Sequence, residues 1–317
     1  MMREVPMFIF TGMLESGKTT MINTLLRNPQ LVNGRKILLL LCEEGEETYD
    51  EEALAAKNVS IRTVEEEERF NATTFRKLDR ELKPDYVIIE FNGMWSPETY
   101  LNVEYPKGYG IAEIMTSVDS STFQVYLNNM RSLMAAQYRA TDMVVFNRFR
   151  DDFNKISFRS VVKAQNLAAK VIFEYEDGTI DADFDASPFD LTQDTIDIAD
   201  SDFGLFYFDA MERVDKYDGK TVKALVRAAH FTGNAQKTHP GFLVGRVGMT
   251  CCEADQQFLG LVCLNSMDFE DGWYRMTATV EAGDGRMYGE APEPKLPVLR
   301  VQALEPAEKP EQEVVGL

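Results

Sequence analysis

The sequence predicts an α/β protein: a mostly parallel, doubly wound sheet, followed by a smaller β-rich domain. In the first half, apolar runs of strand length alternate with segments of helical periodicity. Residues 181–202 then contain eight aspartates and neither lysine nor arginine. After Gly204, short β segments separated by glycine predominate, which favours a small barrel or sandwich. These three observations together predict two domains of different class.

The first domain is expected to span residues 1–180. Between its strands, the segment from Asn71 to Leu82 places Phe75, Leu78 and Leu82 on one helical face. Asn71 is a suitable N-cap, and Pro84 lies just beyond the end of this helix. The strands are predicted, in chain order, at residues 7–11, 36–41, 59–64, 85–90, 111–118, 143–146 and 170–173.

Residues 181–203 are predicted to be an acidic linker, 204–305 a β-barrel-like domain, and 306–317 a flexible tail because that segment is polar and contains proline. The linker begins with alternating aspartates like a calcium loop, but it lacks the turn glycine and the final glutamate that such a loop needs. The strands of the second domain are predicted at residues 205–209, 220–231, 241–250, 258–264, 273–280 and 298–303.

The charge and composition narrow the classes of partner. The 317 residues include 33 basic and 52 acidic ones, for a net charge of −19. Such a polyanion repels nucleic acid and anionic membranes, so neither is expected as a partner. No apolar run is long enough for a transmembrane segment, and the N-terminus lacks a signal-peptide pattern. Because four cysteines, two of them adjacent, make no disulfide framework, we expect a cytoplasmic protein.

The segment 12–20 carries the most specific chemistry of the chain. Gly12, Gly17, Lys18 and Thr19 fill the phosphate-loop template, between an apolar strand and a helical pattern. Backbone N–H groups of such a loop and the helix N-terminus bind phosphate, the lysine reaches the β- and γ-phosphates, and the threonine hydroxyl sits on Mg²⁺. The remaining residues that we expect to contact nucleotide in this loop are Glu15, Ser16 and Thr20.

Four further blocks follow the phosphate loop in an informative order. Residues 42–50, 85–97, 117–123 and 137–148 are similar, respectively, to the acidic switch, the second acidic strand, the Val-Val-Asp block and the base-recognition stretch of the CobW-like GTPases. That family is the metal-chaperone branch of P-loop GTPases that includes HypB and UreG. The resemblance covers residues 7–175 and implies binding of GTP and GDP, with Gly93 near the nucleotide.

The same resemblance, together with the preference of Mg²⁺ for oxygen ligands, indicates a magnesium site. Thr19, Glu90 and an acid of the switch, either Glu43 or Asp50, are expected to surround the ion directly or through water. A charged residue at the end of an apolar strand, such as Glu90, is unusual for a merely solvated acid. Lys18, Glu43 and Asp50 are therefore the predicted catalytic residues.

Two departures from the family pattern affect specificity. Asn147 and Arg148 begin the base-recognition segment, but Arg150 occupies the position of the aspartate that reads guanine, and arginine cannot accept a hydrogen bond. Asp151 could substitute if the loop shifts by one residue, so an altered base specificity stays open. The family's Cys-x-Cys-Cys motif is also missing, and its region contains four consecutive glutamates at 65–68, which are read as a solvated acidic run or as a site for a hard cation.

The second domain contains Cys251 and Cys252 within a segment, 245–255, that resembles the soluble C-terminal domain of YcgQ-like proteins. That resemblance implies an OB-like barrel and an association with a permease. The two thiols, with Asp255, Cys263, His230 or His239, are candidate ligands for a soft ion such as Zn²⁺. The alternative is that both cysteines are small buried hydrophobic residues.

The sequence as a whole predicts a Mg²⁺-dependent GTPase that couples its nucleotide state to a partner, which is a client metalloprotein or a permease component in metal trafficking. One alternative is a nucleotide-dependent regulatory module with little turnover, which the altered base segment would allow. A small-molecule kinase is another, although no arginine-rich lid is evident. The metal, the client and any oligomeric state are left open.

Overall fold

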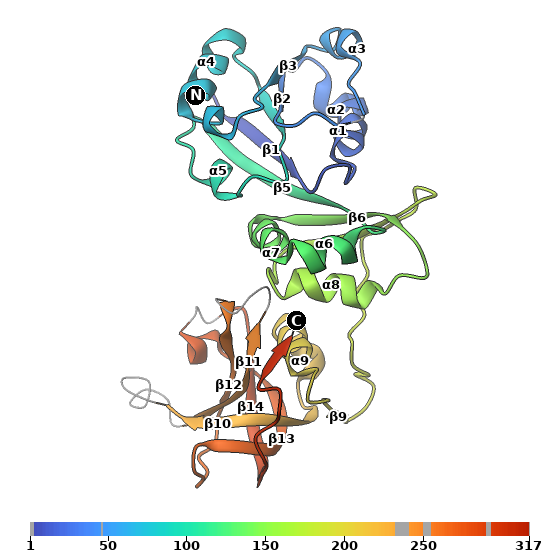
Figure 1. Cartoon of the computed structure of the whole chain (residues 1–317). Coiled ribbons are helices and arrows are strands. Elements are labelled where there is room, and N and C mark those ends of the chain that lie inside the picture. The colour runs from blue at the N-terminus through green and yellow to red at the C-terminus, as the bar shows by residue number, and fades with distance from the viewer. Residues whose placement is uncertain (1–2, 46, 232–240, 250–254, 290–292, 317) are drawn as a thin grey trace. The chain divides into compact units, whose positions relative to one another are not determined.

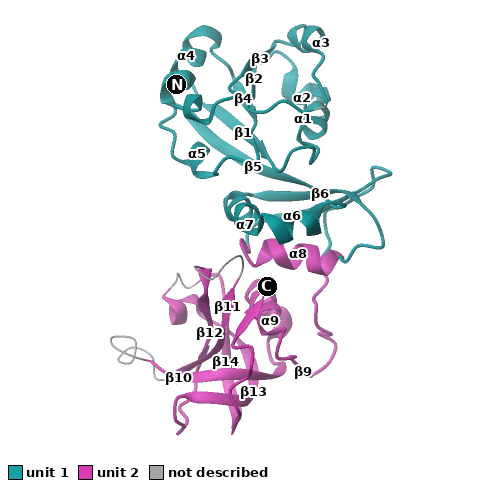
Figure 2. Cartoon of the chain, in the orientation of Figure 1, with its two compact units in different colours: residues 1–154, 168–184 teal, residues 155–167, 185–317 magenta. Residues whose placement is uncertain are grey.

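The computed structural model describes residues 3–45, 47–231, 241–249, 255–289 and 293–316. The chain forms two compact units (Figure 2). Unit 1 comprises residues 1–154 and 168–184, and unit 2 comprises residues 155–167 and 185–317. The predicted fold class is confirmed: a parallel-dominated sheet with helices is followed by a β-rich domain.

Unit 1 is built on an eight-stranded sheet in the order β3-β2-β4-β1-β5-β6-β7-β8. Strands β1, β2, β3, β5 and β6 of this sheet are labelled in Figure 1. All pairs are parallel except β7–β8, which is antiparallel. The central strands are nearly continuous apolar runs, as expected for strands that are buried on both faces. The strands are β1 (Val5–Thr11), β2 (Ile37–Leu41), β3 (Val59–Thr63), β4 (Tyr86–Glu90), β5 (Tyr109–Asp119), β6 (Met143–Phe149), β7 (Lys170–Tyr175) and β8 (Ile180–Asp181).

Helices of unit 1 connect these parallel strands. Helix α4 (Ala72–Leu82) begins at the predicted N-cap, where the Asn71 side chain accepts hydrogen bonds from the backbone N–H groups of Thr73 and Thr74. It buries Phe75 and Leu78, as the periodicity predicts. The other helices are α1 (Lys18–Arg27), α2 (Pro29–Val32), α3 (Glu51–Ala55), α5 (Glu98–Leu101), α6 (Phe123–Asn129) and α7 (Arg131–Ala140), and a 3₁₀ turn covers Glu67–Arg69.

Unit 2 contains a closed five-stranded barrel. Strands β11, β12, β14, β13 and β10 pair in that order, and the additional β10–β11 pairing closes the ring. This is the strand arrangement of the OB-like barrel that was predicted, with β12 and β14 parallel. The bounds are β9 (Thr195–Asp197), β10 (Thr221–His230), β11 (Phe242–Met249), β12 (Gln257–Cys263), β13 (Gly272–Gly283), β14 (Leu296–Pro306) and β15 (Val314–Gly316), with helices α8 (Lys155–Lys163), α9 (Phe203–Glu212) and α10 (Val214–Tyr217) and a 3₁₀ turn at Gly285–Tyr288.

Two local predictions for this unit are wrong. Residues 205–209, predicted as a strand, lie within α9, where Phe203, Phe206 and Ala210 pack into the barrel core at helical spacing. A short apolar run fits either structure, and here packing decides for the helix. The tail predicted to be flexible instead contributes β15, which pairs with β11 and buries Val315 in the same core.

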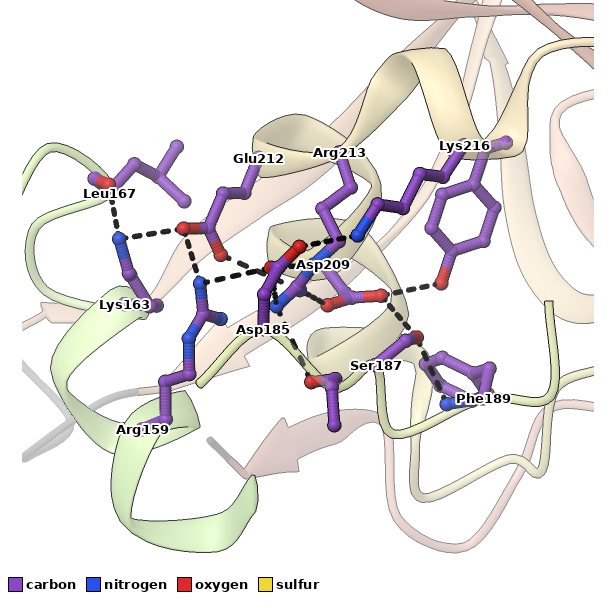
Figure 3. Close-up of polar contacts among 12 residues, drawn as sticks. Arg159, Lys163, Leu167, Asp185, Ser187, Phe189, Asp209, Glu212, Arg213 and Lys216 are labelled. Atoms are coloured by element: carbon purple, nitrogen blue, oxygen red, sulfur yellow. Dashed lines mark hydrogen bonds and ion pairs between the residues drawn. The ribbon is translucent and has the colours of Figure 1, made fainter. Parts of the chain in front are cut away.

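A partly buried ionic cluster joins α8 to α9 within unit 2 (Figure 3). Arg159 and Lys163 of α8 both contact one Glu212 carboxylate oxygen at 2.6 Å. Arg213, which follows α9, pairs with Asp209 and Asp185. Burial alone would raise the pKa of Glu212, but the hydrogen bonds from Arg159 and Lys163 outweigh it and lower that pKa. Glu212 is therefore ionised at neutral pH.

Candidate functional site

The phosphate loop connects β1 to α1 and needs its glycines. The backbone is left-handed at Gly12 and Gly17, with φ values of 131° and 97°, and also at Glu15, with φ of 61°. A Cβ atom on Gly12 would lie 2.2 Å from the Ser117 carbonyl oxygen, so no other residue fits there without a backbone shift. The loop therefore has the compact, glycine-dependent form that brings backbone N–H groups close to an anion.

Three residues from other elements brace this loop. The Asn147 side-chain amide donates a hydrogen bond to the Ser16 carbonyl oxygen, and the Ser16 hydroxyl lies 2.6 Å from that of Ser117. A Cβ atom on Gly93 would lie 1.9 Å from the Gly12 carbonyl oxygen, so the loop rests directly on this glycine. The structure thus places Asn147 and Gly93, both predicted near the nucleotide, against the phosphate loop.

Lys18 is buried and has three partners. Its amine donates to the carbonyl oxygens of Gly12 and Met13, at 2.7 and 2.8 Å, and pairs with the Glu43 carboxylate at 2.5 Å. Only 2% of the lysine side chain and 10% of the glutamate side chain is exposed. Two of the three predicted catalytic residues, Lys18 and Glu43, are therefore in direct contact.

Glu90 lies at the end of β4 and accepts two hydroxyl hydrogen bonds. Thr19 donates to one carboxylate oxygen at 2.6 Å and Tyr49 to the other at 2.5 Å. Burial raises the pKa of Glu90, and the two hydroxyl hydrogen bonds and the nearby Lys18 only partly oppose that shift. A cation beside this carboxylate would remove the cost of burying its charge. Hydroxyl and carboxylate oxygens are also the donors that Mg²⁺ prefers, so the residues present fit this ion.

Tyr49 was not predicted as a site residue. The sequence signal that could have revealed it is a hydroxyl-bearing side chain inside the acidic switch, six residues beyond Glu43. A second contact from the switch links the Thr20 hydroxyl to Glu47 at 2.8 Å. The switch segment is therefore tied to the phosphate loop and β4 through Glu43, Glu47 and Tyr49.

Residues of the phosphate loop and the switch, together with Glu90 and Arg148, border a cavity of about 170 Å³, which we call the phosphate cavity. Its charged side chains comprise four carboxylates and two cations. They are Glu15, Glu43, Glu47, Glu90, Lys18 and Arg148. All predicted phosphate-loop contacts except Gly12 and Ser16, which lie behind the loop surface, line this cavity. An anionic ligand that enters it meets a net negative field unless a cation accompanies it.

Asp50 is placed elsewhere. Its carboxylate accepts the Ala53 backbone N–H at 3.0 Å and caps helix α3, and it does not line the phosphate cavity. Aspartate is one of the best N-cap residues, so this contact explains the residue without a metal. The magnesium and catalytic roles expected for Asp50 consequently gain no support from its position.

The base-recognition segment lies at the end of β6. Arg148 has a left-handed backbone, with φ of 51°, and its guanidinium pairs with Asp119 and donates to the Glu15 carbonyl oxygen at 3.3 Å. Arg150 instead pairs with Asp152 at 3.1 Å and lies over the Phe153 ring. Asp151 is exposed.

The candidate soft-metal ligands do not form a site in the part of the chain that the structure describes. Cys251, Cys252 and His239 lie outside the described residues. Cys263 is buried in the barrel core, where burial raises its pKa, and His230 pairs with Asp271 at 2.8 Å. Among the described residues, no three His, Cys, Asp or Glu side chains gather closely enough to hold a metal ion. Likewise, no described helix is both long and apolar enough to span a membrane.

The parallel sheet, the glycine-dependent loop between β1 and α1, and the buried lysine define a nucleotide-binding domain of the P-loop class. The family described as CobW/HypB/UreG, nucleotide-binding domain, matches residues 6–172, more than half of the chain, and the chain belongs to it. The DUF1980 C-terminal domain matches residues 180–315. Both resemblances seen in the sequence are confirmed.

Individual relatives are more distant. A zinc chaperone CobW from Sinorhizobium sp. is 31% identical over 108 residues, which is 30% of this chain and 30% of that protein. The zinc-bound YjiA GTPase from E. coli is 21% identical, with a TM-score of 0.42 over 54% of this chain and 57% of that one. The hydrogenase maturation factor HypB from Archaeoglobus fulgidus is 18% identical, with a TM-score of 0.40 over 54% of this chain and 80% of that one.

Proposed function

We propose that this protein is a Mg²⁺-dependent GTPase whose nucleotide state controls its docking to a client or partner in metal trafficking. The observation that carries the proposal is the pairing of Lys18 with Glu43 beside the Thr19–Glu90 contact. This arrangement combines a phosphate-binding cation, a hydroxyl and two carboxylates at the N-terminus of one helix. Phosphoryl transfer by P-loop proteins needs that combination.

The charge of the site supports a requirement for a divalent cation. Four carboxylates and two cations line the cavity, and a nucleoside triphosphate adds about four negative charges. Thr19 and Glu90 would hold Mg²⁺, and Glu43 would complete the set directly or through water. The ion would neutralise charge that develops on the phosphate oxygens. The chain's own contribution is to position Lys18 and to keep both carboxylates oriented through hydroxyl and ammonium contacts.

Nucleotide binding and movement of the switch are, in this proposal, one event. Lys18 would leave Glu43 to contact phosphate, and Thr19 and Glu90 would give up their mutual contact to hold a cation. The same exchange loosens Tyr49, whose hydroxyl is bonded to Glu90. Glu43 and Tyr49 would thereby change partners when nucleotide arrives and return when it leaves, which is the usual output of a switch segment.

Glu43 and Asp50 are the two proposed acids of the switch, and conservative variants separate their roles. Glu43→Gln should tighten Mg²⁺-free GDP binding, because Lys18 loses its competing partner, and should slow hydrolysis if the carboxylate orients the attacking water. Asp50→Asn retains the cap of α3, since asparagine caps equally well. If hydrolysis is unchanged in Asp50→Asn, a catalytic role for Asp50 is ruled out.

Base recognition is proposed to involve Asn147, Arg148 and Asp151, with GTP as the ligand. Because Arg150 pairs with Asp152, Asp151 is the carboxylate of this segment that guanine could reach. Calorimetric titration with GTP, GDP and ATP in the presence of Mg²⁺ tests this directly. Equal affinity for ATP and GTP would contradict the guanine assignment, and an unchanged preference in Asp151→Asn would remove that residue from it.

The central experiment measures GTP hydrolysis and binding by wild type, Lys18→Ala and the exposed control Lys57→Ala. We expect Lys18→Ala to lose at least a hundredfold in hydrolysis and the control to lose nothing, because Lys18 lines the phosphate cavity and Lys57 does not. Hydrolysis that survives Lys18→Ala or chelation of Mg²⁺ would overturn the mechanism. Tight GTP binding with a single slow turnover would instead favour the regulatory module, which the altered base segment supports.

Zinc is the proposed cargo, in keeping with the zinc chaperone relative. The proposed ligands are Cys251 and Cys252. Cys42 is not proposed, because burial raises the pKa of its thiol and disfavours the thiolate that zinc needs. Zinc titration of wild type against the Cys251→Ser, Cys252→Ser double variant tests the assignment. Unchanged zinc binding in the double variant would overturn it.

A further inference from the structure

A second cavity of unit 1, which we call the β7 groove, extends well beyond the proposed nucleotide site, with which it shares Gly17, Thr20, Asn147 and Arg148 at one end. It encloses about 600 Å³ and opens beside α1. Its floor is formed by side chains at alternate positions of four neighbouring strands, β1, β5, β6 and β7. They are Phe8, Phe10, Glu113, Met115, Val145, Asn147, Ile172 and Glu174.

The strand pairing shows that these side chains belong to one face of the sheet. Phe8 pairs with Glu113 and Phe10 with Met115 across β1 and β5. Val145 pairs with Ile172 across β6 and β7. Alternate residues of paired strands point to the same side, so the floor is a continuous, mostly apolar strip. Met21 and Leu25 of α1 form one wall, and Ile180 of β8, whose side chain is 62% exposed, forms part of the other.

The path of the chain explains why this strip is open. Parallel sheets are normally covered by helices on both faces, because strand-to-strand crossovers place helices there. After β7 the chain does not form a helix that returns over β6 and β5; it turns at Asp177 and Gly178 into β8 and then enters unit 2 at residue 185. The position that such a helix would occupy, next to α1, is the β7 groove.

Most of the charged side chains that line the groove are acidic. Glu113, Glu174 and Glu176 line it, and none of the three forms an ion pair with a described residue. Arg148, the cation among the lining residues, is already paired with Asp119. The groove thus combines an apolar floor with unneutralised carboxylates.

We propose that the β7 groove binds an amphipathic, basic helix of a partner protein. An apolar helical face would cover the strip, and flanking lysines or arginines would pair with Glu113, Glu174 and Glu176. A second copy of this chain is a poor occupant, because two molecules of net charge −19 repel each other. The proposal goes beyond nucleotide chemistry, and its test needs no hydrolysis.

The test uses full-length protein without nucleotide and a fluorescent 14-residue helical peptide of leucine and lysine. A second peptide with every lysine replaced by glutamate keeps the same apolar face. Ile180→Asp changes the groove wall, and Val125→Asp is the matched control, since that side chain is 61% exposed on α6. Glu174→Lys reverses a groove charge, and Glu65→Lys does the same in the exposed acidic run at 65–68.

We expect the lysine peptide to bind at least tenfold more tightly than the glutamate peptide. Ile180→Asp and Glu174→Lys should each weaken binding at least fivefold, whereas Val125→Asp and Glu65→Lys should leave it unchanged. A benzophenone placed on the apolar face should cross-link to Met21 and Met115, which line the groove.

Equal losses in groove and control variants, or cross-links only outside the groove, would overturn the proposal. So would a wild-type dimer, seen by sedimentation, that the peptide dissociates, because the occupant would then be a second copy. Repeating the titration with Lys18→Ala keeps this outcome separate from the GTPase proposal: that variant should bind the peptide like wild type even though it does not hydrolyse GTP.

Discussion

Removal of the Lys18 charge should destabilise nucleotide-free unit 1 more than removal of its partner's charge. Lys18→Met keeps the length of the side chain but leaves Glu43 without a counter-charge and two carbonyl oxygens without their donor. Breaking a buried ion pair from one side costs about 3–5 kcal/mol. Because Glu43 borders a cavity and keeps some exposure, we expect the lower end, about 3 kcal/mol.

Glu43→Gln leaves Lys18 bonded to both carbonyl oxygens and removes one charge-assisted hydrogen bond. The expected loss is about 1.5 kcal/mol, the low end for hydrogen bonds to charged groups. In the double variant no buried charge is left without a partner at this position. Its loss should therefore be smaller than the sum of the single losses, by about 1–2 kcal/mol.

Urea unfolding can follow unit 1 by itself. The chain has two tryptophans, Trp95 in unit 1 and Trp273 in unit 2. In a Trp273→Phe background, the fluorescence of Trp95, which packs against Phe91 in the unit 1 core, reports on that unit alone. A larger loss for Glu43→Gln than for Lys18→Met would refute the reasoning. Strict additivity in the double variant would also refute it, because the contact would then contribute no coupling energy.

Three further predictions concern the phosphate loop, the switch and unit 2. Gly93→Ala should weaken GDP binding at least tenfold in calorimetry, because its Cβ would displace the Gly12 carbonyl. Gly110→Ala should leave binding unchanged, because its Cβ meets no atom within 4 Å and the residue does not line the phosphate cavity. Tyr49→Phe should cost about 1.5–3 kcal/mol in urea unfolding of the nucleotide-free protein, as the loss of a hydrogen bond to a carboxylate does; no loss would mean that Glu90 finds another donor. Glu212→Gln should cost unit 2 about 3 kcal/mol at pH 7, measured through Trp273. Folding lowers the pKa of Glu212, so its ionised carboxylate stabilises unit 2 above the unfolded pKa of about 4.3. This stabilisation disappears as the pH falls through the folded pKa. The difference in unfolding free energy between wild type and Glu212→Gln should therefore shrink in acid.

Much of unit 1 could be predicted because its strands are buried and parallel. All seven predicted strands of the first domain form, with ends that shift by at most three residues. Apolar runs such as Ile37–Leu41 indicate a strand without knowledge of their neighbours. The phosphate loop could also be predicted, since its glycines are required by backbone conformation alone.

Contacts between distant segments could not be predicted in the same way. The Tyr49–Glu90 hydrogen bond joins residues 41 positions apart, and the N-cap role of Asp50 competes with the metal role that its acidity indicates. The prediction of a strand at 205–209 was wrong. An aromatic run favours a strand locally, but here Phe203, Phe206 and Ala210 pack into the barrel core from one side of a helix. In each case tertiary packing selects between two local solutions of similar free energy.

The unit to which helix α8 belongs could not be predicted from the sequence either. Its position between β6 and β7 in the chain marks it as a crossover helix of the first sheet, and the first domain predicted at residues 1–180 includes it. Yet it clusters with unit 2, because Arg159 and Lys163 share one carboxylate with α9, about fifty residues further along the chain. Burying Glu212 without a counter-charge would be costly, so its ion pairs with Arg159 and Lys163 hold α8 against α9. The chain enters α8 at Lys155, only eight residues after Asn147, which braces the phosphate loop. Only residues 148–154 therefore separate this contact of unit 1 from a helix that belongs to unit 2.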